Sequence, residues 1–432
     1  MFCSIWTVSA TSWPNRASCS RVSSAATKGS CPALRYGSSA AYAPHAGLRT
    51  LDSRSHDRRQ QPFAVASTIR QQWTESSRPN GVVHPMPTCS ADQLRGLMAG
   101  LFEAVGTPTD ISTFIASSLV AANLTGHDSH GVIRILQYIE VVESGSLDPA
   151  AVATVVSIDG ATLKVDGKWG WGQPAFHLAV RETIALARQY GIAIGTVERC
   201  FHVGRVAPYV EMIARDGMIG IAMANAGAAV APYGARTRVM GTNPIAWAVP
   251  GNDEDHPFAL DIATAQIAEG KVRVARNKGV PVPPGSIVNM DGAPSLDPND
   301  FYDGGALMAF GGHKGSGFSI FAQVLGRGLA GMTQERLKTH RGGNGPVVIA
   351  IDPARFGPLD VFRDVVSEEA ERVRSATPAD GFVEVMMPGD PEVREQARRE
   401  IEGCVVDDTT WNALVAEARR FGLPASMYAV AD

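Results

Sequence analysis

The sequence has few cysteines and no long apolar run, and these two absences exclude several classes of protein. Six cysteines are scattered over 432 residues, without a Cys-x-x-Cys pair or a spacing typical of a disulfide-stabilised fold. The longest apolar stretches, 218–226 and 347–351, are far shorter than the roughly 20 residues needed to cross a bilayer. We therefore expect a soluble protein of a reducing compartment, with the cytoplasm as its location.

An excess of charge of either sign is absent as well. The chain carries 39 Lys and Arg against 43 Asp and Glu, a formal net charge of -4. Such a balance creates no global field that would attract nucleic acid or an anionic membrane. Both partners are disfavoured, and a small molecule is the expected ligand. The length suffices for two or three domains with a large core.

The first 85 residues differ in composition from the rest. Residues 1–50 contain no Asp or Glu, five Lys or Arg, and many Ser and Ala, without the apolar periodicity that builds a core. We predict that residues 1–85 are a disordered extension. Two explanations are open: an organellar transit peptide, which would place the protein in an organellar matrix, or upstream sequence translated from a start codon placed too early.

Apolar periodicity predicts an α/β (α+β) fold in the remainder. Three helices open it, the first capped by Ser90 with Gln93, and the third starting within residues 126–134. Strands are predicted at 152–158, 161–165, 192–197, 219–224, 258–262 and 347–351. Further helices are predicted at 174–190, 207–215, 318–329, 361–373, 392–402 and 408–421, with a weak helix at 263–268 and an ordered loop at 279–298.

Residues 126–134 place an imidazole, a hydroxyl and a guanidinium at a predicted helix start. On one helix, His130, Arg134 and Tyr138 are neighbours because they are four residues apart. His130 could then transfer a proton beside Arg134, which would hold a carboxylate through two parallel hydrogen bonds, while Tyr138 walls the pocket. The structural alternative is a capping histidine and a surface ion pair. A metal site from His127 and His130 is disfavoured, because these two with Asp128 lie too close in sequence for all three to face one ion without further ligands.

Three further polar residues lie where predicted strands end. His202 follows one strand, with Gly204 allowing the backbone to approach a ligand, and Asn225 ends the next. Ligands usually bind at strand ends in α/β architectures. Asp261, in the strand 258–262, is suited either to a cofactor hydroxyl or to capping the following segment.

The two common phosphate-binding fingerprints, Gly-x-x-x-x-Gly-Lys-Ser/Thr and Gly-x-Gly-x-x-Gly, are absent. Residues 311–317 are nevertheless rich in glycine, contain His313 and Lys314, and precede an apolar helix. Backbone N–H groups at a helix start, with a lysine beside them, suit a phosphate; simple helix packing is the alternative. Gly389 and Asp390 either contact a ligand or form an ordinary turn.

Taken together, these motifs resemble the malate/L-lactate dehydrogenase type 2 family. That family includes malate, lactate and ureidoglycolate dehydrogenases and the cyclic imino acid reductases. The resemblance covers about Ser90 to Leu423 and rests on six motifs in the expected order. The motifs are residues 126–134, 202–204, 241–244, 261–264, 270–271 and 312–315.

The resemblance implies a nicotinamide-dependent oxidoreductase that uses NAD or NADP and forms a homodimer. A non-Rossmann sheet domain at 156–329 would bind the cofactor, and it would pack with a helical and dimerisation part formed by both chain ends, 86–155 and 330–432. The cofactor contacts that it implies are Asp261, Ile262, Ala263, Thr264, His313, Lys314, Gly389 and Asp390.

The resemblance also implies how a small 2-hydroxy acid is oxidised. C2 gives hydride to nicotinamide while its hydroxyl loses a proton to a base, and His202 matches the family position for that base. His130 is the second candidate, and Ser129 or His130 orients the substrate oxygen. Arg134 holds the carboxylate. Asn225 bonds either the substrate or the nicotinamide carboxamide, and Tyr138 is a further substrate contact.

Two other activities are kept as alternatives. Reduction of a cyclic 2-imino acid, such as piperideine- or pyrroline-2-carboxylate, needs the same carboxylate-binding arginine and hydride but delivers the proton to nitrogen. A metal hydrolase that uses His127, His130, His202 and His313 belongs to a different class, although no metal ligand set is predicted from spacing.

Overall fold

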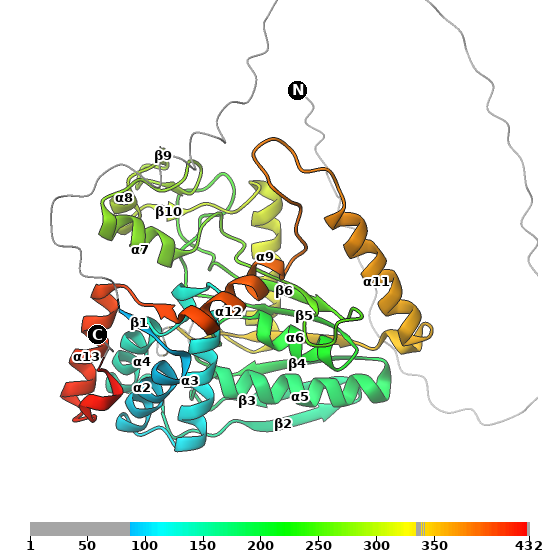
Figure 1. The fold of residues 1–432 in the computed structure, drawn as a ribbon, viewed down its shortest axis with the longest axis horizontal. Helices are drawn as coiled ribbons and strands as arrows, with labels where there is room; N and C mark the ends of the chain where they lie inside the picture. Colours follow the sequence, from blue (N-terminus) through cyan, green and yellow to red (C-terminus); the bar gives the residue numbers. More distant parts are fainter. Residues whose placement is uncertain (1–86, 334–337, 339, 341, 430–432) are drawn as a thin grey trace, which may run out of the picture. The chain divides into compact units, whose positions relative to one another are not determined.

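The computed structural model describes residues 87–333, 338, 340 and 342–429. The extension predicted at 1–85 lies outside these residues. Figure 1 shows the described part as helices arranged around one large sheet. Every helix within the described ranges is too short or too polar to serve as a membrane span.

A seven-stranded sheet lies at the centre of the fold. Its strands, in spatial order, are β2 (Thr154–Asp159), β3 (Thr162–Asp166), β4 (Ile192–Glu198), β11 (Pro346–Ile351), β5 (Ile219–Ala224), β6 (Ile245–Val249) and β7 (Phe258–Ile262). Among these strands, β3 and β4 pair in parallel and the other neighbours pair antiparallel. A Rossmann sheet is mostly parallel. The predicted non-Rossmann α+β fold is therefore confirmed.

Two helices cover one face of this sheet. α5 (Gly172–Tyr190) packs on β3, β4 and β11, and α6 (Ala207–Arg215) packs on β5, β6 and β7. The buried residues Phe176, Val180 and Ile184 recur along α5 at helical spacing. Full burial of such a side chain contributes roughly 1.5–3 kcal/mol to stability. A third helix, α9 (His313–Leu329), lies against β5 and β11.

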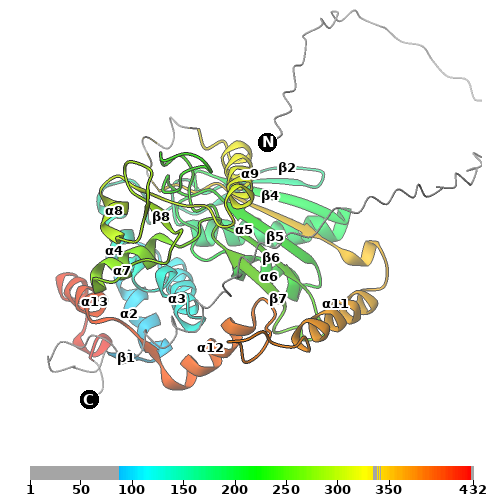
Figure 2. The ribbon, with the colours of Figure 1, turned by 90° about the horizontal axis from the view of Figure 1, so that it is seen from above.

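Helices from both ends of the chain form a second layer. α2 (Ala91–Ala104), α3 (Thr109–Leu124) and α4 (Arg134–Glu143) pack with α13 (Asp408–Arg420), and β1 (Thr88–Cys89) pairs with β12 (Cys404–Val405). The blue and red segments lie side by side in both views (Figures 1 and 2). α2 begins as predicted, because the Ser90 hydroxyl accepts the Gln93 N–H at 3.1 Å. The prediction that both chain ends share one helical part is confirmed.

The remaining elements flank these layers. α7 (Glu269–Lys278) and α8 (Pro298–Tyr302) pack with a small sheet of β10 (Ala306–Leu307), β8 (Ile287–Val288) and β9 (Pro294–Ser295) around an apolar cluster of their own. α11 (Leu359–Arg374) and α12 (Asp390–Glu402) follow β11 along the chain.

The structure differs from the predicted elements at β11, at residues 263–268 and at residues 279–298. β11 is a central strand of the large sheet, although its residues fall in the range predicted for the helical part. Residues 263–268 form no helix, because the chain is held extended where Ala265 bridges Ala309. The loop predicted at 279–298 contains β8 and β9.

Candidate active site

The segment that carries His130 is a short turn and not the start of the following helix. Asp128–His130 form one 3-10 turn, Gly131 is extended, and α4 begins only at Arg134. The predicted single helix with His130 and Arg134 on one face is therefore wrong. The turn and the helix still meet, because Arg134 Nε donates to the carbonyl oxygen of Ser129 at 2.6 Å.

Two histidines from distant parts of the chain meet at this turn. The rings of His130 and His202 stack with their centroids 5.9 Å apart and their planes at 17°. The Ser129 hydroxyl lies 3.2 Å from Nδ1 of His130. Burial, assisted by the charge of Arg134, lowers the pKa of His130 to about 3. Burial and Arg134 also hold the pKa of His202 well below its usual value, so both rings are neutral at pH 7.

Tyr138 and the Gly204 backbone hold His202, and Gln173 in turn holds Tyr138. Its Nδ1 lies 2.7 Å from the Tyr138 hydroxyl and accepts the Gly204 N–H at 3.3 Å. Burial raises the pKa of Tyr138 to about 12, so its hydroxyl keeps its proton. Gln173, in the first turn of α5, donates to the same hydroxyl at 2.9 Å. The Tyr138 hydroxyl thus faces His202, whereas the sequence predicts a wall of the pocket and a substrate contact.

The Arg134 guanidinium is anchored on one side. Nη1 donates to Gln137 Oε1 at 2.9 Å, and Nη2 makes no hydrogen bond with any described residue. Burial lowers the pKa of Arg134, but a guanidinium stays charged in proteins. α7 lies directly against the 128–130 turn, because a Cβ on Gly270 would lie only 2.9 Å from the Ser129 Cβ. This close approach explains the glycine of the 270–271 motif.

A pocket of about 380 Å³ lies along the edge strand β7. Its walls are Ala259, Leu260, Asp261, Ile262, Met386, Met387, Pro388, Gly389, Pro391 and Glu392. Gly389 has a φ of +100°, a conformation that favours glycine. The pocket adjoins the 128–130 turn, since Glu392 Oε1 lies 3.1 Å from His127 Nε2. Three of the predicted cofactor residues therefore line one pocket.

Four of the other five predicted cofactor residues lie at the far end of β7, and the fifth, Asp390, begins α12 beside Gly389. Phe310 donates its N–H to the carbonyl oxygen of Thr264 at 3.1 Å, so residues 263–264 adjoin the glycine-rich loop before α9. His313 and Lys314 begin α9 and are exposed. A helix N-terminus with a lysine suits phosphate, and the apolar walls of the pocket along β7 suit flat rings. The residues present therefore fit an extended anionic dinucleotide.

Three residues that the sequence predicts as ligand contacts already hydrogen bond within the protein through their carboxylate or amide groups. Asp261 accepts two N–H groups at the start of α6, at 2.7 and 2.8 Å. Asp390 is bonded by an arginine of α11 at 2.5 and 3.0 Å, and Asn225 accepts an N–H of the turn before β11 at 2.7 Å. Asp261 thus caps α6 and not the segment that follows it. Asn225 has a structural role.

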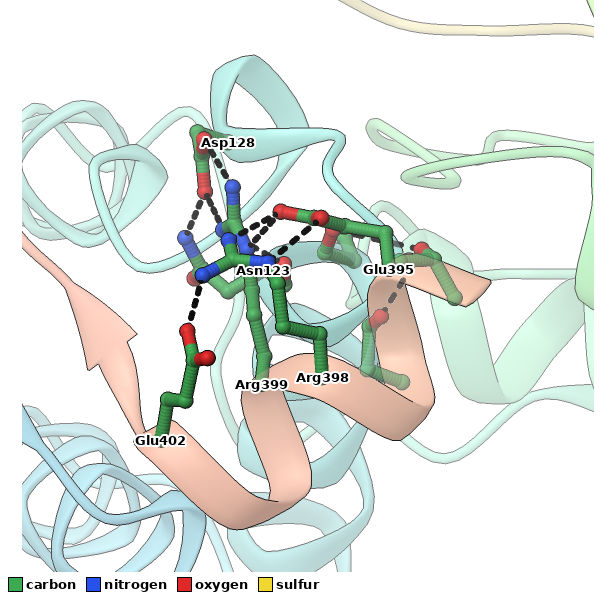
Figure 3. Close-up of polar contacts among 9 residues, drawn as sticks. Asn123, Asp128, Glu395, Arg398, Arg399 and Glu402 are labelled. Carbon is green, nitrogen blue, oxygen red and sulfur yellow. Dashed lines mark hydrogen bonds and ion pairs between the residues drawn. The ribbon is translucent and has the colours of Figure 1, made fainter. Parts of the chain in front are cut away.

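Arg399 of α12 also bonds the 128–130 turn (Figure 3). It donates to both carboxylate oxygens of Asp128, at 2.6 and 3.2 Å, and to the Asn123 carbonyl oxygen at 2.7 Å. The Asn123 amide also donates to Asp128 at 2.7 Å. Because Asp128 directly precedes the two candidate side chains of the turn, these bonds determine where those side chains lie.

The histidines of the hydrolase alternative are not brought together. His127 contacts Glu392, and His313 lies against the ring of Tyr233, while His130 and His202 are neighbours. In the described part of the chain, no three His, Cys, Asp or Glu side chains are placed to share a metal ion.

Sequence reasoning missed Gln173 and Arg399. Gln173 directly follows the glycine-rich residues 167–172, and a polar side chain at the start of a buried helix is a weak signal. Arg399 lies in a helix with charges on most of its surface, where nothing distinguishes it from its neighbours. Both act through contacts that only the fold creates.

Comparisons with known proteins identify the family of the chain. A sequence model of the malate/L-lactate dehydrogenase family matches residues 89–415. Hydroxycarboxylate dehydrogenase B of Escherichia coli O157:H7 is 34% identical over 343 residues, 77% of this chain and 94% of that protein. The structure of sulfolactate dehydrogenase from Methanocaldococcus jannaschii matches with a TM-score of 0.72 and 31% identity, over 79% of this chain and 99% of that one.

A reductase is also among the similar structures. Delta1-piperideine-2-carboxylate reductase from Pseudomonas syringae pvar. tomato matches with a TM-score of 0.69 and 33% identity, over 77% of this chain and 99% of that one. The family match covers both the turn at 128–130 and the loop that carries His202. The chain therefore belongs to the malate/L-lactate dehydrogenase family.

Proposed function

We propose that this protein transfers hydride between a nicotinamide cofactor and C2 of a small 2-hydroxy acid or 2-oxo acid. The observation that carries the proposal is the close grouping of a part-buried guanidinium, Arg134, with two neutral imidazoles, His130 and His202. A guanidinium with a free edge binds a carboxylate, and an imidazole beside it exchanges a proton with the neighbouring hydroxyl.

Each side chain has a separate task in this proposal. His202 exchanges the proton through Nε2, because its Nδ1 is already bonded to Tyr138 and Gly204. Arg134 holds the carboxylate and so aligns C2. Ser129 and His130 orient the substrate oxygen from the 128–130 turn. A bound carboxylate would also offset the charge of Arg134 and raise the pKa of His202 toward neutrality.

The cofactor, NAD or NADP, would lie along β7. Lys314 and the N-terminus of α9 would hold the phosphates of the cofactor. Ile262, Ala263 and Gly389 would line the parts of the cofactor on either side of the phosphates. When bound, nicotinamide accepts the hydride from C2 in oxidation and donates it in reduction.

A cyclic 2-imino acid is the second candidate substrate. The similarity to delta1-piperideine-2-carboxylate reductase favours it, and the same Arg134 contact would hold its carboxylate. His202 would then deliver its proton to the ring nitrogen. The two candidates differ only in the atom that receives the proton.

Fluorescence titration with NADH and NADPH, followed by a rate screen, tests the proposal. We expect a reduced cofactor to bind, and Lys314→Met to weaken its binding roughly tenfold, about 1.4 kcal/mol. Lys164→Met, on β3, is the control and should bind normally. The screen covers 2-oxo acids and cyclic 2-imino acids with both cofactors. Absence of oxidation or reduction in every combination would refute the proposed reaction.

Arg399→Met tests whether α12 positions the 128–130 turn. We expect kcat/KM to fall roughly tenfold or more, because small displacements of catalytic groups are costly. Arg398→Met is the matched control on the same helix, since Arg398 bonds Glu395 and Glu402 but not Asp128 (Figure 3). Steady-state kinetics and circular dichroism of both variants are compared. Equal losses in the two would contradict the positioning role.

We further propose that the protein is a homodimer of a reducing compartment such as the cytoplasm. The described cysteines, Cys89, Cys200 and Cys404, are free thiols. Five large apolar side chains of α9 are exposed, and a second copy of the chain would cover them. They are Phe318, Ile320, Phe321, Val324 and Leu329. This surface lies on α9, outside the residues predicted as the dimerisation part, 86–155 and 330–432.

Light scattering on the purified chain tests the dimer. We expect a mass of twice the 45.7 kDa protomer, and a monomer for Val324→Asp, because a charge cannot be buried unpaired in an apolar interface. Val361→Asp on α11 is the control, since Val361 is 55% exposed and Val324 63%. A dimeric Val324→Asp variant would place the interface elsewhere.

A further inference from the structure

We propose that Gln173 is a positioning residue for proton transfer: through Tyr138, its side-chain amide determines which ring nitrogen of His202 carries the proton. The proposal rests on the proposed function, in which His202 exchanges a proton with the substrate. It concerns one chain of hydrogen bonds, 2.9 Å from Gln173 to Tyr138 and 2.7 Å from Tyr138 to His202.

The chain of hydrogen bonds is rigid because its members are enclosed. Gln173 and Tyr138 are fully buried. The start of α5 touches the loop that carries His202, since a Cβ on Gly172 would lie 2.3 and 2.4 Å from the carbonyl oxygens of Phe201 and His202. Glycine alone permits this approach. The three side chains therefore cannot move apart to relieve an unfavourable hydrogen bond.

The donors determine the direction of the hydrogen bonds in the free protein. The Gly204 N–H points at Nδ1 of His202, so this nitrogen accepts. Gln173 donates to the Tyr138 oxygen, and Tyr138 therefore gives its own hydrogen to Nδ1. A neutral imidazole carries one proton, which must then be on Nε2. In this arrangement Nε2 cannot accept a proton from a substrate hydroxyl.

The amide of Gln173 has one polar partner. Its Oε1 is buried and makes no hydrogen bond within the described residues, whereas buried acceptors are nearly always paired. A half-turn of the amide exchanges Oε1 with Nε2, which are of similar size. Oε1 would then accept the Tyr138 hydrogen, and the Tyr138 oxygen would accept Nδ1–H of His202. Nδ1 would no longer accept the Gly204 N–H, and Nε2 of His202 would be bare.

Proton transfer in either direction requires this second arrangement. In oxidation, the substrate hydroxyl gives its proton to bare Nε2 as hydride leaves C2, and the resulting imidazolium donates Nδ1–H to Tyr138. In reduction, the imidazolium returns the Nε2 proton to the substrate oxygen and keeps Nδ1–H. The reactive neutral ring is thus the one protonated at Nδ1. Gln173 supports it by accepting the hydrogen of Tyr138.

The tautomer of His202 is measurable by nitrogen-15 NMR of the histidine-labelled full-length protein, without cofactor or substrate. Its signals are identified by their loss in His202→Ala. We expect the wild-type ring to carry its proton on Nε2. In Gln173→Glu an ionised carboxylate can only accept, so we expect the proton on Nδ1. Gln173→Met, similar in size and unable to hydrogen bond, should keep the wild-type tautomer.

A double variant and kinetics separate this role from packing. Adding Tyr138→Phe to Gln173→Glu removes the connecting hydroxyl and should return the proton to Nε2. We expect Gln173→Met to lower kcat roughly tenfold in both directions with KM unchanged, and Gln173→Glu to retain more of the activity.

Two results would overturn the proposal. One is a wild-type His202 protonated on Nδ1, which needs no variant to fold. The other is a folded Gln173→Glu protein whose proton stays on Nε2. Failure to turn over any tested acid or imine would refute the proposed function, but the tautomer measurements would still decide the role of Gln173.

Discussion

His202→Ala is expected to lower kcat by about 10²–10⁴-fold, the usual contribution of a general acid or base. The variant removes the imidazole that is bonded to Tyr138 and stacked on His130, and nothing else in the site replaces its Nε2. Cofactor affinity should stay within about twofold, since the proposed cofactor residues lie along β7 and not in this loop. Steady-state kinetics and fluorescence titration measure the two effects separately.

Two comparisons sharpen this expectation. His256→Ala is the control, because His256 is exposed and paired with Asp253 away from the site. His130→Ala should cost less than His202→Ala, roughly tenfold in kcat/KM, since His130 is proposed to orient the substrate oxygen. A larger loss in His130→Ala, together with normal turnover in His202→Ala, would transfer the role of base to His130.

Arg134→Lys is expected to lower kcat/KM roughly 100-fold, about 2.7 kcal/mol, with a higher KM and a lower kcat. Lysine keeps the charge but lacks the planar fork that binds a carboxylate through two parallel hydrogen bonds. It also cannot keep both present contacts, to the Ser129 carbonyl oxygen and to Gln137. The turn that carries His130 would therefore lose an anchor, which is why kcat should fall as well.

Arg215→Lys is the matched control for Arg134→Lys. Arg215 lies at the end of α6, is half exposed, and pairs with Glu211 outside the site. Kinetics with a 2-oxo acid, and with the same substrate as its uncharged amide, test the carboxylate contact directly. If Arg134→Lys discriminates between acid and amide as strongly as the wild type, Arg134 does not bind the carboxylate.

Local sequence patterns predicted most elements of the fold correctly. The helix Ala207–Arg215 and the strands Ile219–Ala224 and Phe258–Ile262 occur at the predicted residues. Apolar periodicity suffices here, because each element buries one face against neighbours of the same cluster. The prediction failed at residues 126–134, where apolar spacing continues into α4 but extended Gly131 separates the turn from the helix.

The sequence by itself determined the residue types of the site, the order of its motifs and the family that they resemble, since these depend only on identity and spacing. Only the tertiary structure decided which side chains touch. Tyr138 and His202 are 64 residues apart, and Asp128 and Arg399 are 271 apart. Helical spacing relates residues three or four apart, whereas these contacts depend on how α4, α5 and α12 pack around the 128–130 turn.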